Sequence, residues 1–254
     1  MVSTNILTEE TRIERLRVAS IEHWTNELKH AHLIETRFLI NQLQKIGFRC
    51  LKCGKCCKKK FGDNYVHLFL SEIEAISKNY RIDIEEIVSP YLEDILTDCV
   101  SKKFDEMSKS IDSEGFFHVD GWILKRCKSG NCIFLKENKC HIYKSRPSIC
   151  STYPFYIYKS KMMYSKCPGI GHNISLKDSY SLASNLISRY ISEVKYLILM
   201  ASRFHTRVVS KSGKSKFYEN YSKGLIRFIV HNPGKIYEGL IQLNSEKVLI
   251  TNIY

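Results

Sequence analysis

Apolar residues recur at intervals of three or four along the first part of the chain, from about Thr8 to Ile46. This spacing places the apolar side chains on one face of a helix. The pattern therefore predicts one long amphipathic helix or a helical hairpin, which ends at Gly47 and packs on the rest of the protein. The residues that carry the pattern are Ile13, Leu16, Ile21, Trp24, Leu28, Leu33, Phe38, Leu43 and Ile46.

The middle of the chain alternates short apolar runs with polar breaks, which is typical of short strands and helices. Ser71 and Glu74 have the spacing of a capping box and predict a helix start. The apolar runs on either side of Lys159-Ser160 predict a β-hairpin. We expect strands at 65–69 and 116–124, helices over 71–78 and from about Asp83 until Pro90 interrupts, a loop at 101–114, and hairpin strands at 153–158 and 162–164.

The last part of the chain has a different pattern, with a long helical periodicity from Asp178 to about Arg207. We expect a flexible break at 210–215, a helix over 221–230, a turn at Asn232-Pro-Gly, and then a short tail. Together these elements predict an α+β protein. A small cysteine-rich domain with short strands and helices would be flanked by an N-terminal long helix and a C-terminal helical region. The predicted divisions are 1–47, 48–171 and 172–254.

The charge pattern argues against a membrane protein and adds a basic surface. The most apolar stretch, near Ile191 to Ala201, contains Glu193 and Lys195, so we expect no membrane span. The N-terminus has no apolar run suited to a signal peptide. We therefore expect a cytoplasmic protein, in which thiols stay reduced. The formal net charge of the 254 residues is +13.

Four cysteines fall within eight residues, in the run Cys50-Leu-Lys-Cys53-Gly-Lys-Cys56-Cys57. The C-x2-C spacing lets two sulfurs turn toward one point, and a further cysteine nearly completes a tetrathiolate shell. Disulfides are the alternative. They are disfavoured because the chain is large enough to bury a core and because neighbouring cysteines rarely pair without strain. The surrounding lysines would stabilise thiolates. They are Lys52, Lys55, Lys58, Lys59 and Lys60.

Four more cysteines follow in separate short motifs: Cys132, Cys140, Cys150 and Cys167. Eight thiols suit two four-thiolate sites, or one centre with spare thiols. Cys99 and Cys127 stand outside the pattern. We expect Cys99 to be a small buried hydrophobe in a helical stretch, and the role of Cys127 stays open.

The order of these motifs resembles a known family. C-x2-C-x2-C-C is followed by C-x-F-L, C-x-I-Y, R-P-x-x-C, Y-P-F and C-P-G over about Phe48 to Gly171. This succession resembles the YkgJ-type cysteine-cluster family, which is described as zinc- or iron-chelating, and flagellin lysine N-methylases resemble the same family. The resemblance implies that the motif cysteines bind metal. They are Cys50, Cys53, Cys56, Cys57, Cys132, Cys140, Cys150 and Cys167.

The spacing favours an iron–sulfur cluster, of the 4Fe–4S kind, over zinc. C-x2-C-x2-C with a distant Cys-Pro, here Cys167-Pro168, resembles ferredoxin ligation. Zinc remains the alternative, because zinc sites also use C-x2-C. We expect Tyr143, Tyr153, Phe155 and Tyr156 to wrap the centre and exclude water.

Three functions stay open. The first is an iron–sulfur protein with a redox or methyl-transfer role. The second is a zinc-stabilised scaffold that binds nucleic acid, a ribonucleoprotein or an acidic protein through its basic surface, and the third is a lysine N-methylase. The basic surface is predicted in the C-terminal region, where nine Lys and Arg oppose three Glu from Ala201 to Tyr254. The residues that would face an anionic partner are Lys211, Lys214, Lys216, Lys223 and Arg227.

Overall fold

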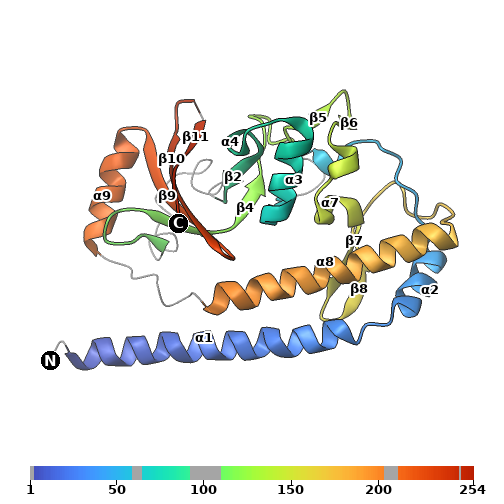
Figure 1. The fold of residues 1–254 in the computed structure, drawn as a ribbon, viewed down its shortest axis with the longest axis horizontal. Coiled ribbons are helices and arrows are strands. Elements are labelled where there is room, and N and C mark those ends of the chain that lie inside the picture. Colours follow the sequence, from blue (N-terminus) through green and yellow to red (C-terminus); the bar gives the residue numbers. More distant parts are fainter. Residues whose placement is uncertain (1–2, 59–64, 92–109, 203–210, 246) are drawn as a thin grey trace. The chain divides into compact units, whose positions relative to one another are not determined.

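The chain divides into two compact units that interleave along the sequence. The computed structural model describes residues 3–58, 65–91, 110–202, 211–245 and 247–254. The first unit combines residues 1–66 with 127–202, and the second combines 67–126 with 203–254 (Figure 1). The first unit unites the N-terminal helices, the motif cysteines and the long helix that follows them. The division into residues 1–47, 48–171 and 172–254, which the sequence pattern predicts, stays a prediction.

Three helices build the core of the first unit: α1 (Ser3–His32), α2 (Thr36–Ile46) and α8 (Leu176–Ser202). Both α1 and α2 pack on α8. The predicted N-terminal helical segment is therefore two helices, which break after His32. Of the predicted apolar face, Leu43 is buried, whereas Leu33 and Phe38 remain exposed. Buried residues of this core are Ala31, Leu39, Leu43, Phe155, Ile157, Leu182, Ala183, Leu186, Tyr190 and Val194.

The start of α8 is fixed by a side-chain cap. The hydroxyl of Ser175 accepts a hydrogen bond from the Asp178 N–H at 3.0 Å and donates to the Asp178 carboxylate at 2.7 Å. This arrangement satisfies a backbone donor that the first helical turn leaves without a partner. The helix expected from Asp178 thus begins two residues earlier. Its expected end near Arg207 lies outside the described residues.

Short elements lie among the cysteines of the first unit. They are η1 (Lys55–Cys57), β5 (Leu135–Lys136), β6 (Lys139–Cys140), η4 (Tyr143–Ser145), α7 (Ser148–Thr152), β7 (Phe155–Tyr158) and β8 (Lys161–Tyr164). Three of them, η1, β6 and α7, contain motif cysteines. The predicted hairpin is confirmed, because β7 and β8 pair antiparallel. Lys159 and Ser160 form its turn, both with positive φ, as the twist of a two-residue hairpin requires.

The described residues of the second unit form two sheets. One has the order β1-β4-β2 and the other the order β11-β10-β9-β3. Helices α3 (Leu70–Tyr80), α4 (Ile84–Ile87) and α9 (Lys211–Ser222) also belong to the described part of this unit. The strands are β1 (His67–Leu68), β2 (Val88–Pro90), β3 (Phe117–Asp120), β4 (Trp122–Leu124), β9 (Leu225–Asn232), β10 (Lys235–Gln242) and β11 (Lys247–Ile253).

Several predictions for this unit need correction. The expected strand 116–124 is two strands in different sheets, separated at Gly121. The helix α3 begins at Leu70. The Phe69 N–H at its N-cap donates to the carboxylate of Glu72 at 3.0 Å, so Glu72 and not Glu74 takes the capping role. The helix expected from Asp83 is present but ends at Ile87. The expected loop at 101–114 lies mostly outside the described residues.

The C-terminal predictions were wrong in a more consequential way. The segment expected to be a flexible break is the start of α9, from Lys211. The expected helix over 221–230 is mostly strand β9, and the expected tail forms β10 and β11. The turn at Asn232-Pro-Gly is confirmed, because it joins β9 to β10 with Asn232 opposite Lys235. The C-terminal region is therefore a helix followed by a three-stranded meander.

The α+β class predicted from the sequence is confirmed by this mixture of helices and small sheets. None of the helices within the described ranges combines the length and the hydropathy that crossing a bilayer requires.

Candidate metal centre

Backbone pairing brings the two ends of the cysteine region together. Phe48 and Ile170 form an isolated β-bridge, and the Arg49 N–H donates to the Gly169 carbonyl at 3.0 Å. These contacts lie directly beside Cys50 and Cys167. The residue before the first cysteine and the residues after the last one thus share one short piece of sheet-like structure.

A second backbone contact joins the first cysteine loop to the middle of the chain. The Cys132 N–H donates to the Cys57 carbonyl at 2.9 Å, across an intervening stretch that contains much of the second unit. The Cys57 N–H in turn donates to the Gly54 carbonyl at 3.0 Å, which closes η1. The chain positions the thiols of the first loop against those of the later loops through its own hydrogen bonds.

One group of thiols is in hydrogen-bonding contact. The Cys57 thiol interacts in this way with the sulfurs of Cys132, Cys140 and Cys56, and these contacts raise its pKa. The same contacts lower the pKa of Cys56 to about 7 and of Cys140 to about 6, and they lower the pKa of Cys132. The Cys57 S–H has a single proton, so it donates to one of these three sulfurs at a time. The group is therefore poised to hold thiolates close together.

Cys150 lies beside this group. Burial raises the pKa of its thiol, and the negative charges of Cys132, Cys56 and Cys140 raise it further. The opposing influence is the guanidinium of Arg146. Cys150 is thus a neighbour by charge rather than by a hydrogen bond.

A second group of thiols surrounds Cys167. Burial raises the pKa of Cys167, the Gly169 N–H that donates to its sulfur at 3.4 Å lowers it, and Cys53, Cys50 and Cys56 raise it through their charge. The distant Cys-Pro of the sequence pattern therefore lies near the C-x2-C-x2-C run.

Tyr143 and Arg146 flank the first loop. The Arg146 guanidinium stacks 3.8 Å from the Tyr143 ring centroid, and its Nε donates to the Tyr143 carbonyl at 3.1 Å. The Lys52 ammonium lies 5.0 Å from the same ring centroid. Burial raises the pKa of the Tyr143 hydroxyl, and its hydrogen bond with Cys50 raises it further. The sequence gave no signal for the stack of Arg146 on Tyr143.

The predicted aromatic shell needs a partial correction. Burial and the nearby thiols of Cys167, Cys56 and Cys53 raise the pKa of Tyr153, so this ring lies near the thiols as expected. Phe155 instead belongs to the helical core, and Tyr156 faces solvent with 37% of its surface exposed.

The cysteines outside the motif differ from one another. Cys127 is exposed, and its sulfur lies 3.0 Å from the Ser129 hydroxyl and 3.3 Å from the Asn131 carbonyl oxygen. The burial and helical placement expected for Cys99 lie outside the described residues. Cys50, Cys53 and Cys56 are exposed as free thiols, and the other motif thiols are half-buried.

The donor set suits a thiophilic metal, because sulfur ligands select zinc and iron–sulfur centres. Across the described ranges, no three or more His, Cys, Asp or Glu side chains already stand in an arrangement that could hold a metal ion. The thiols meet as hydrogen-bonding and charged neighbours, and a bound metal would draw them into its own geometry.

The fold and this site define an α+β protein with a cysteine-rich, metal-chelating unit. Residues 49–168 match the model of the CxxCxxCC family, described as a "putative zinc- or iron-chelating domain". The YkgJ-type resemblance stated from the motifs fits this family and is confirmed. No solved structure matches the chain.

Proposed function

We propose that the domain binds metal in two neighbouring sets of four thiolates. The first set is Cys50, Cys53, Cys56 and Cys167, and the second is Cys57, Cys132, Cys140 and Cys150. The division explains why Cys56 and Cys57 are adjacent: each serves a different set. It also uses all eight motif cysteines and leaves Cys127 aside.

The first set is proposed to hold an iron–sulfur cluster. The observation that carries this proposal is the proximity of Cys167 to Cys53, Cys50 and Cys56, which interact with it through charge. Three closely spaced cysteines and one distant Cys-Pro are the ligand pattern of ferredoxin clusters. A cluster supplies one-electron chemistry, and a redox role is proposed on that ground alone.

The second set is proposed to hold a single ion, for which zinc is the simplest choice. Around one zinc ion with Zn–S bonds of about 2.3 Å, tetrahedral sulfurs stand about 3.8 Å apart. The hydrogen-bonding contacts of Cys57 with Cys132 and Cys140 are compatible with such close sulfurs. A four-iron cluster places iron and sulfide between its thiolates and spreads them further.

The chain's own residues would tune both sets. Arg146 supplies positive charge near Cys56, Cys140 and Cys150, which favours thiolates. Its stack on Tyr143 holds the guanidinium in place. Methyl transfer, the lysine N-methylase activity and a cytoplasmic location remain predictions from the sequence.

The test is metal and sulfide analysis after anaerobic purification. We expect the parent protein to contain iron, acid-labile sulfide and a visible absorption band, together with zinc. Cys53→Ala should lose sulfide and colour, and Cys132→Ala should lose zinc. The matched control is Cys127→Ala, which removes an exposed thiol of the same unit and should leave both metals in place.

Two outcomes would contradict the proposal in different ways. A parent protein with zinc but without sulfide would refute the iron–sulfur assignment of the first set. Equal metal content in the parent and Cys53→Ala would refute the assignment of ligands. Because ligand binding is coupled to folding in such domains, the unfolding temperature is a second readout for each variant.

A further inference from the structure

The β7–β8 hairpin presents one face to the core and the other to solvent. Phe155 and Ile157 are buried, whereas Tyr156 and Tyr158, which alternate with them along the strand, are 37% and 59% exposed. On the partner strand, Met163 lies opposite Tyr156 and is 45% exposed. Residues on one face of a strand alternate with those on the other. The outer face of the hairpin therefore exposes two tyrosine rings and a methionine, where exposed polar residues would be expected.

This outer face is also basic. Lys161 lies opposite Tyr158 in the register, and the Lys159 ammonium lies 5.4 Å from the Tyr158 ring centroid. Lys166 follows the hairpin, and the sequence from Phe155 to Lys166 has no carboxylate. At the turn, the Ser160 hydroxyl donates to the Glu27 carboxylate at 3.3 Å.

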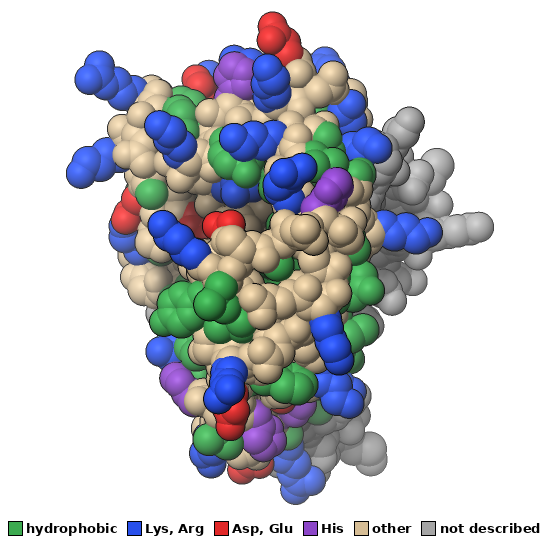
Figure 2. All heavy atoms as spheres, turned by 90° about the vertical axis from the view of Figure 1, so that its right-hand side faces the viewer, with side chains coloured by type: hydrophobic (Ala, Val, Ile, Leu, Met, Phe, Trp, Pro, Cys, Tyr) green, Lys and Arg blue, Asp and Glu red, His purple; other side chains and the backbone are tan. Residues whose placement is uncertain are grey.

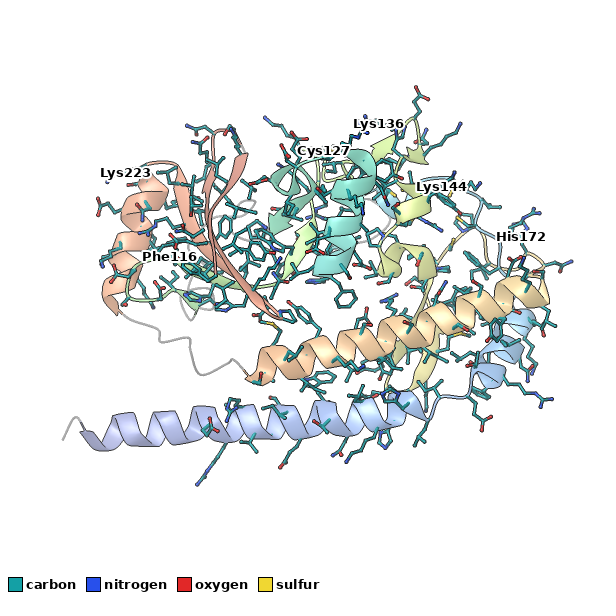
Figure 3. The ribbon with its side chains drawn as sticks, in the orientation of Figure 1. Phe116, Cys127, Lys136, Lys144, His172 and Lys223 are labelled. Carbon is teal, nitrogen blue, oxygen red and sulfur yellow. The ribbon has the colours of Figure 1, made fainter. Side chains whose placement is uncertain are left out.

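The surrounding loops of the cysteine unit strengthen this charge. Glu137 is the sole carboxylate among residues 48–58 and 127–172. Figure 3 labels two of the basic residues, Lys136 in β5 and Lys144 in η4, on the short elements between the cysteines. In the space-filling view of Figure 2, Lys and Arg side chains outnumber acidic ones over the face turned to the viewer. The Lys and Arg in these two ranges are Arg49, Lys52, Lys55, Lys58, Lys128, Lys136, Lys139, Lys144, Arg146, Lys159, Lys161 and Lys166.

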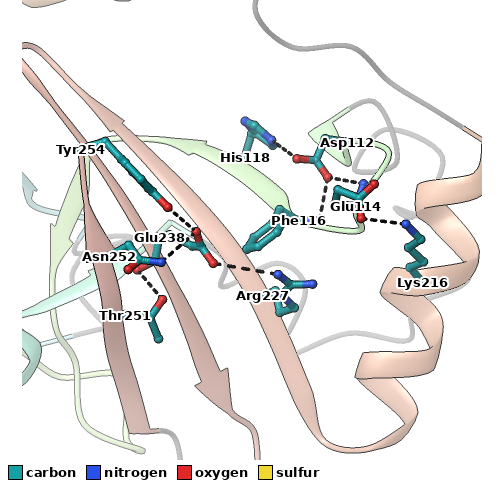
Figure 4. A network of polar contacts seen from close by, with 10 residues as sticks. All are labelled: Asp112, Glu114, Phe116, His118, Lys216, Arg227, Glu238, Thr251, Asn252 and Tyr254. Atoms are coloured by element: carbon teal, nitrogen blue, oxygen red, sulfur yellow. Dashed lines mark hydrogen bonds and ion pairs between the residues drawn. The ribbon is translucent and has the colours of Figure 1, made fainter.

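The C-terminal cations offer a contrast. Lys216 pairs with Glu114 at 2.8 Å and Lys223 with Glu219 at 2.6 Å. Arg227 lies 3.9 Å from the Glu238 carboxylate (Figure 4). Cations engaged with carboxylates in this way are less available to an anionic partner. The charge balance therefore favours the cysteine unit over the C-terminal region as the surface for such a partner.

We propose that the outer face of the β7–β8 hairpin binds single-stranded nucleic acid. Tyr156 and Tyr158 would stack on two successive bases, and Lys161 and Lys166 would contact phosphates. Outward side chains two residues apart on a strand stand about 6.7 Å apart, which gives each ring its own base. Aromatic platforms in positively charged surroundings are the usual device for single strands.

Single-stranded nucleic acid fits better than the other anionic partners. Bases in a duplex are stacked on one another and offer no free ring faces to tyrosine. An acidic peptide would pair with the lysines, but it gives no reason for exposed rings. The inference concerns a partner and goes beyond the proposed metal function.

The hairpin is held firmly enough to act as a preformed surface. Its strands follow α7, which contains Cys150, and precede Cys167, so both ends lie beside the thiols. At the turn, the Ser160 N–H donates to the Tyr190 hydroxyl at 3.4 Å. Pre-organisation of this kind reduces the entropy lost on binding.

The experiment measures binding of a fluorescent single-stranded RNA or DNA oligonucleotide by anisotropy across a salt series. The double variant Tyr156→Ala/Tyr158→Ala should weaken binding at least tenfold, since each stacked base contributes a factor of about five or more. Tyr180→Ala is the matched control, because Tyr180 is 60% exposed on α8. Lys161→Gln should reduce the slope of log affinity against log salt by about 0.7, and Lys177→Gln should not.

Metal content of every protein is measured in the same preparations, so failure of the metal function and failure of this inference are separate results. No binding by a metal-loaded parent protein would overturn the inference. Equal affinity for duplex, or unchanged affinity in the tyrosine variant, would show attraction by charge alone and would also overturn it. Stronger binding to polyglutamate than to the oligonucleotide would assign the surface to an acidic protein instead.

Discussion

The glycine within the first cysteine loop offers a sharp test of the site. Gly54 has a φ of +66° in the left-handed region, between Cys53 and Cys56. A Cβ at this position would overlap the carbonyl oxygen of Asn138 and lie 2.8 Å from Cδ1 of Leu135. Asn138 and Leu135 belong to the β5–β6 segment between Cys132 and Cys140. Gly54 thus allows two cysteine loops to approach within backbone contact.

Replacement of Gly54 by Ala combines two costs. The left-handed conformation costs about 1–2 kcal/mol for a residue with a Cβ. The overlap with a backbone carbonyl, which a rotamer change cannot relieve, adds about 1–3 kcal/mol. We therefore expect Gly54→Ala to lower the free energy of unfolding by about 2–5 kcal/mol. Metal content should fall with it, because the loops that bring the two groups of thiols together would separate.

Gly171→Ala is the matched control. Gly171 has a φ of +83°, and a Cβ there would have no atom within 4 Å, so only the conformational cost of about 1–2 kcal/mol remains. Both variants are measured by urea denaturation and by metal analysis of the purified protein. If Gly54→Ala matched Gly171→Ala in stability and in metal content, close approach of the two loops would not be needed for the site.

Three further predictions concern the first unit. Burial and then a hydrogen bond with Glu27 raise the pKa of Tyr190 from 10.0 to about 12. The protonated hydroxyl therefore stabilises the folded protein fully below pH 10, and this stabilisation is lost as the pH rises toward 12. In alkaline denaturation, Tyr190→Phe should lose less stability than the parent protein between pH 10 and pH 12. Phe155→Ala, at a core position with 1% exposure, should cost about 3–5 kcal/mol in urea denaturation, and the exposed neighbour substitution Tyr156→Ala should cost little. Cys57 and, to a smaller extent, Arg146 lower the pKa of Cys140. Arg146→Gln should therefore shift metal uptake to higher pH in a binding titration, because metal binds the thiolate. An unshifted midpoint would contradict this role of the guanidinium.

The hairpin at 155–164 could be predicted because the local sequence determines it. Alternating side chains meet at a two-residue turn, and no distant contact is needed to choose the structure. The long helix from Leu176 was predictable for the same reason, since its apolar periodicity continues over many turns. Its exact start depended on the Ser175 cap, which the periodicity does not reveal.

The sequence pattern predicted a helix where the C-terminal sheet begins, because the spacing of its apolar residues fits the helical period as well as the strand period. Ile226, Phe228 and Val230 are buried at every second position of β9. A short apolar run of this kind satisfies helical spacing as well as strand spacing, and tertiary pairing with β10 and β3 decides the outcome. The parallel pairing of β3 with β9 joins residues more than a hundred positions apart, which local patterns cannot specify.

The cysteines of the site were predictable by residue type and spacing, but their grouping was not. The ferredoxin-like spacing indicated that Cys167 joins the earlier cysteines of the run, but nothing in the sequence indicates that Cys57 contacts Cys132 and Cys140. The buried pair His118 and His231 was also missed. Their ring nitrogens lie 2.7 Å apart in the second unit, and the only signal for them was an ordinary histidine in each of two strands.

The chain connection between the cysteine loops gives an energetic reason for a metal. Packing of α2 on α8 and the Phe48–Ile170 bridge already join the outer ends of the cysteine region. The excursion from Cys57 to Cys132 spans about 75 residues and includes folded elements of the second unit. Closing a fully flexible loop of that length would cost about 4 kcal/mol of chain entropy, which is an upper bound for this segment. The hydrogen bond from Cys132 to Cys57 contributes about 1 kcal/mol, which is too little to offset that cost. Thiolate–metal bonding, worth about 10 kcal/mol or more in structural zinc sites, is large enough. The thiols crowd at the point where this loop closes. A metal held there would keep together two loops that the backbone contact alone holds weakly, so the thiols would serve the structure as well as the chemistry.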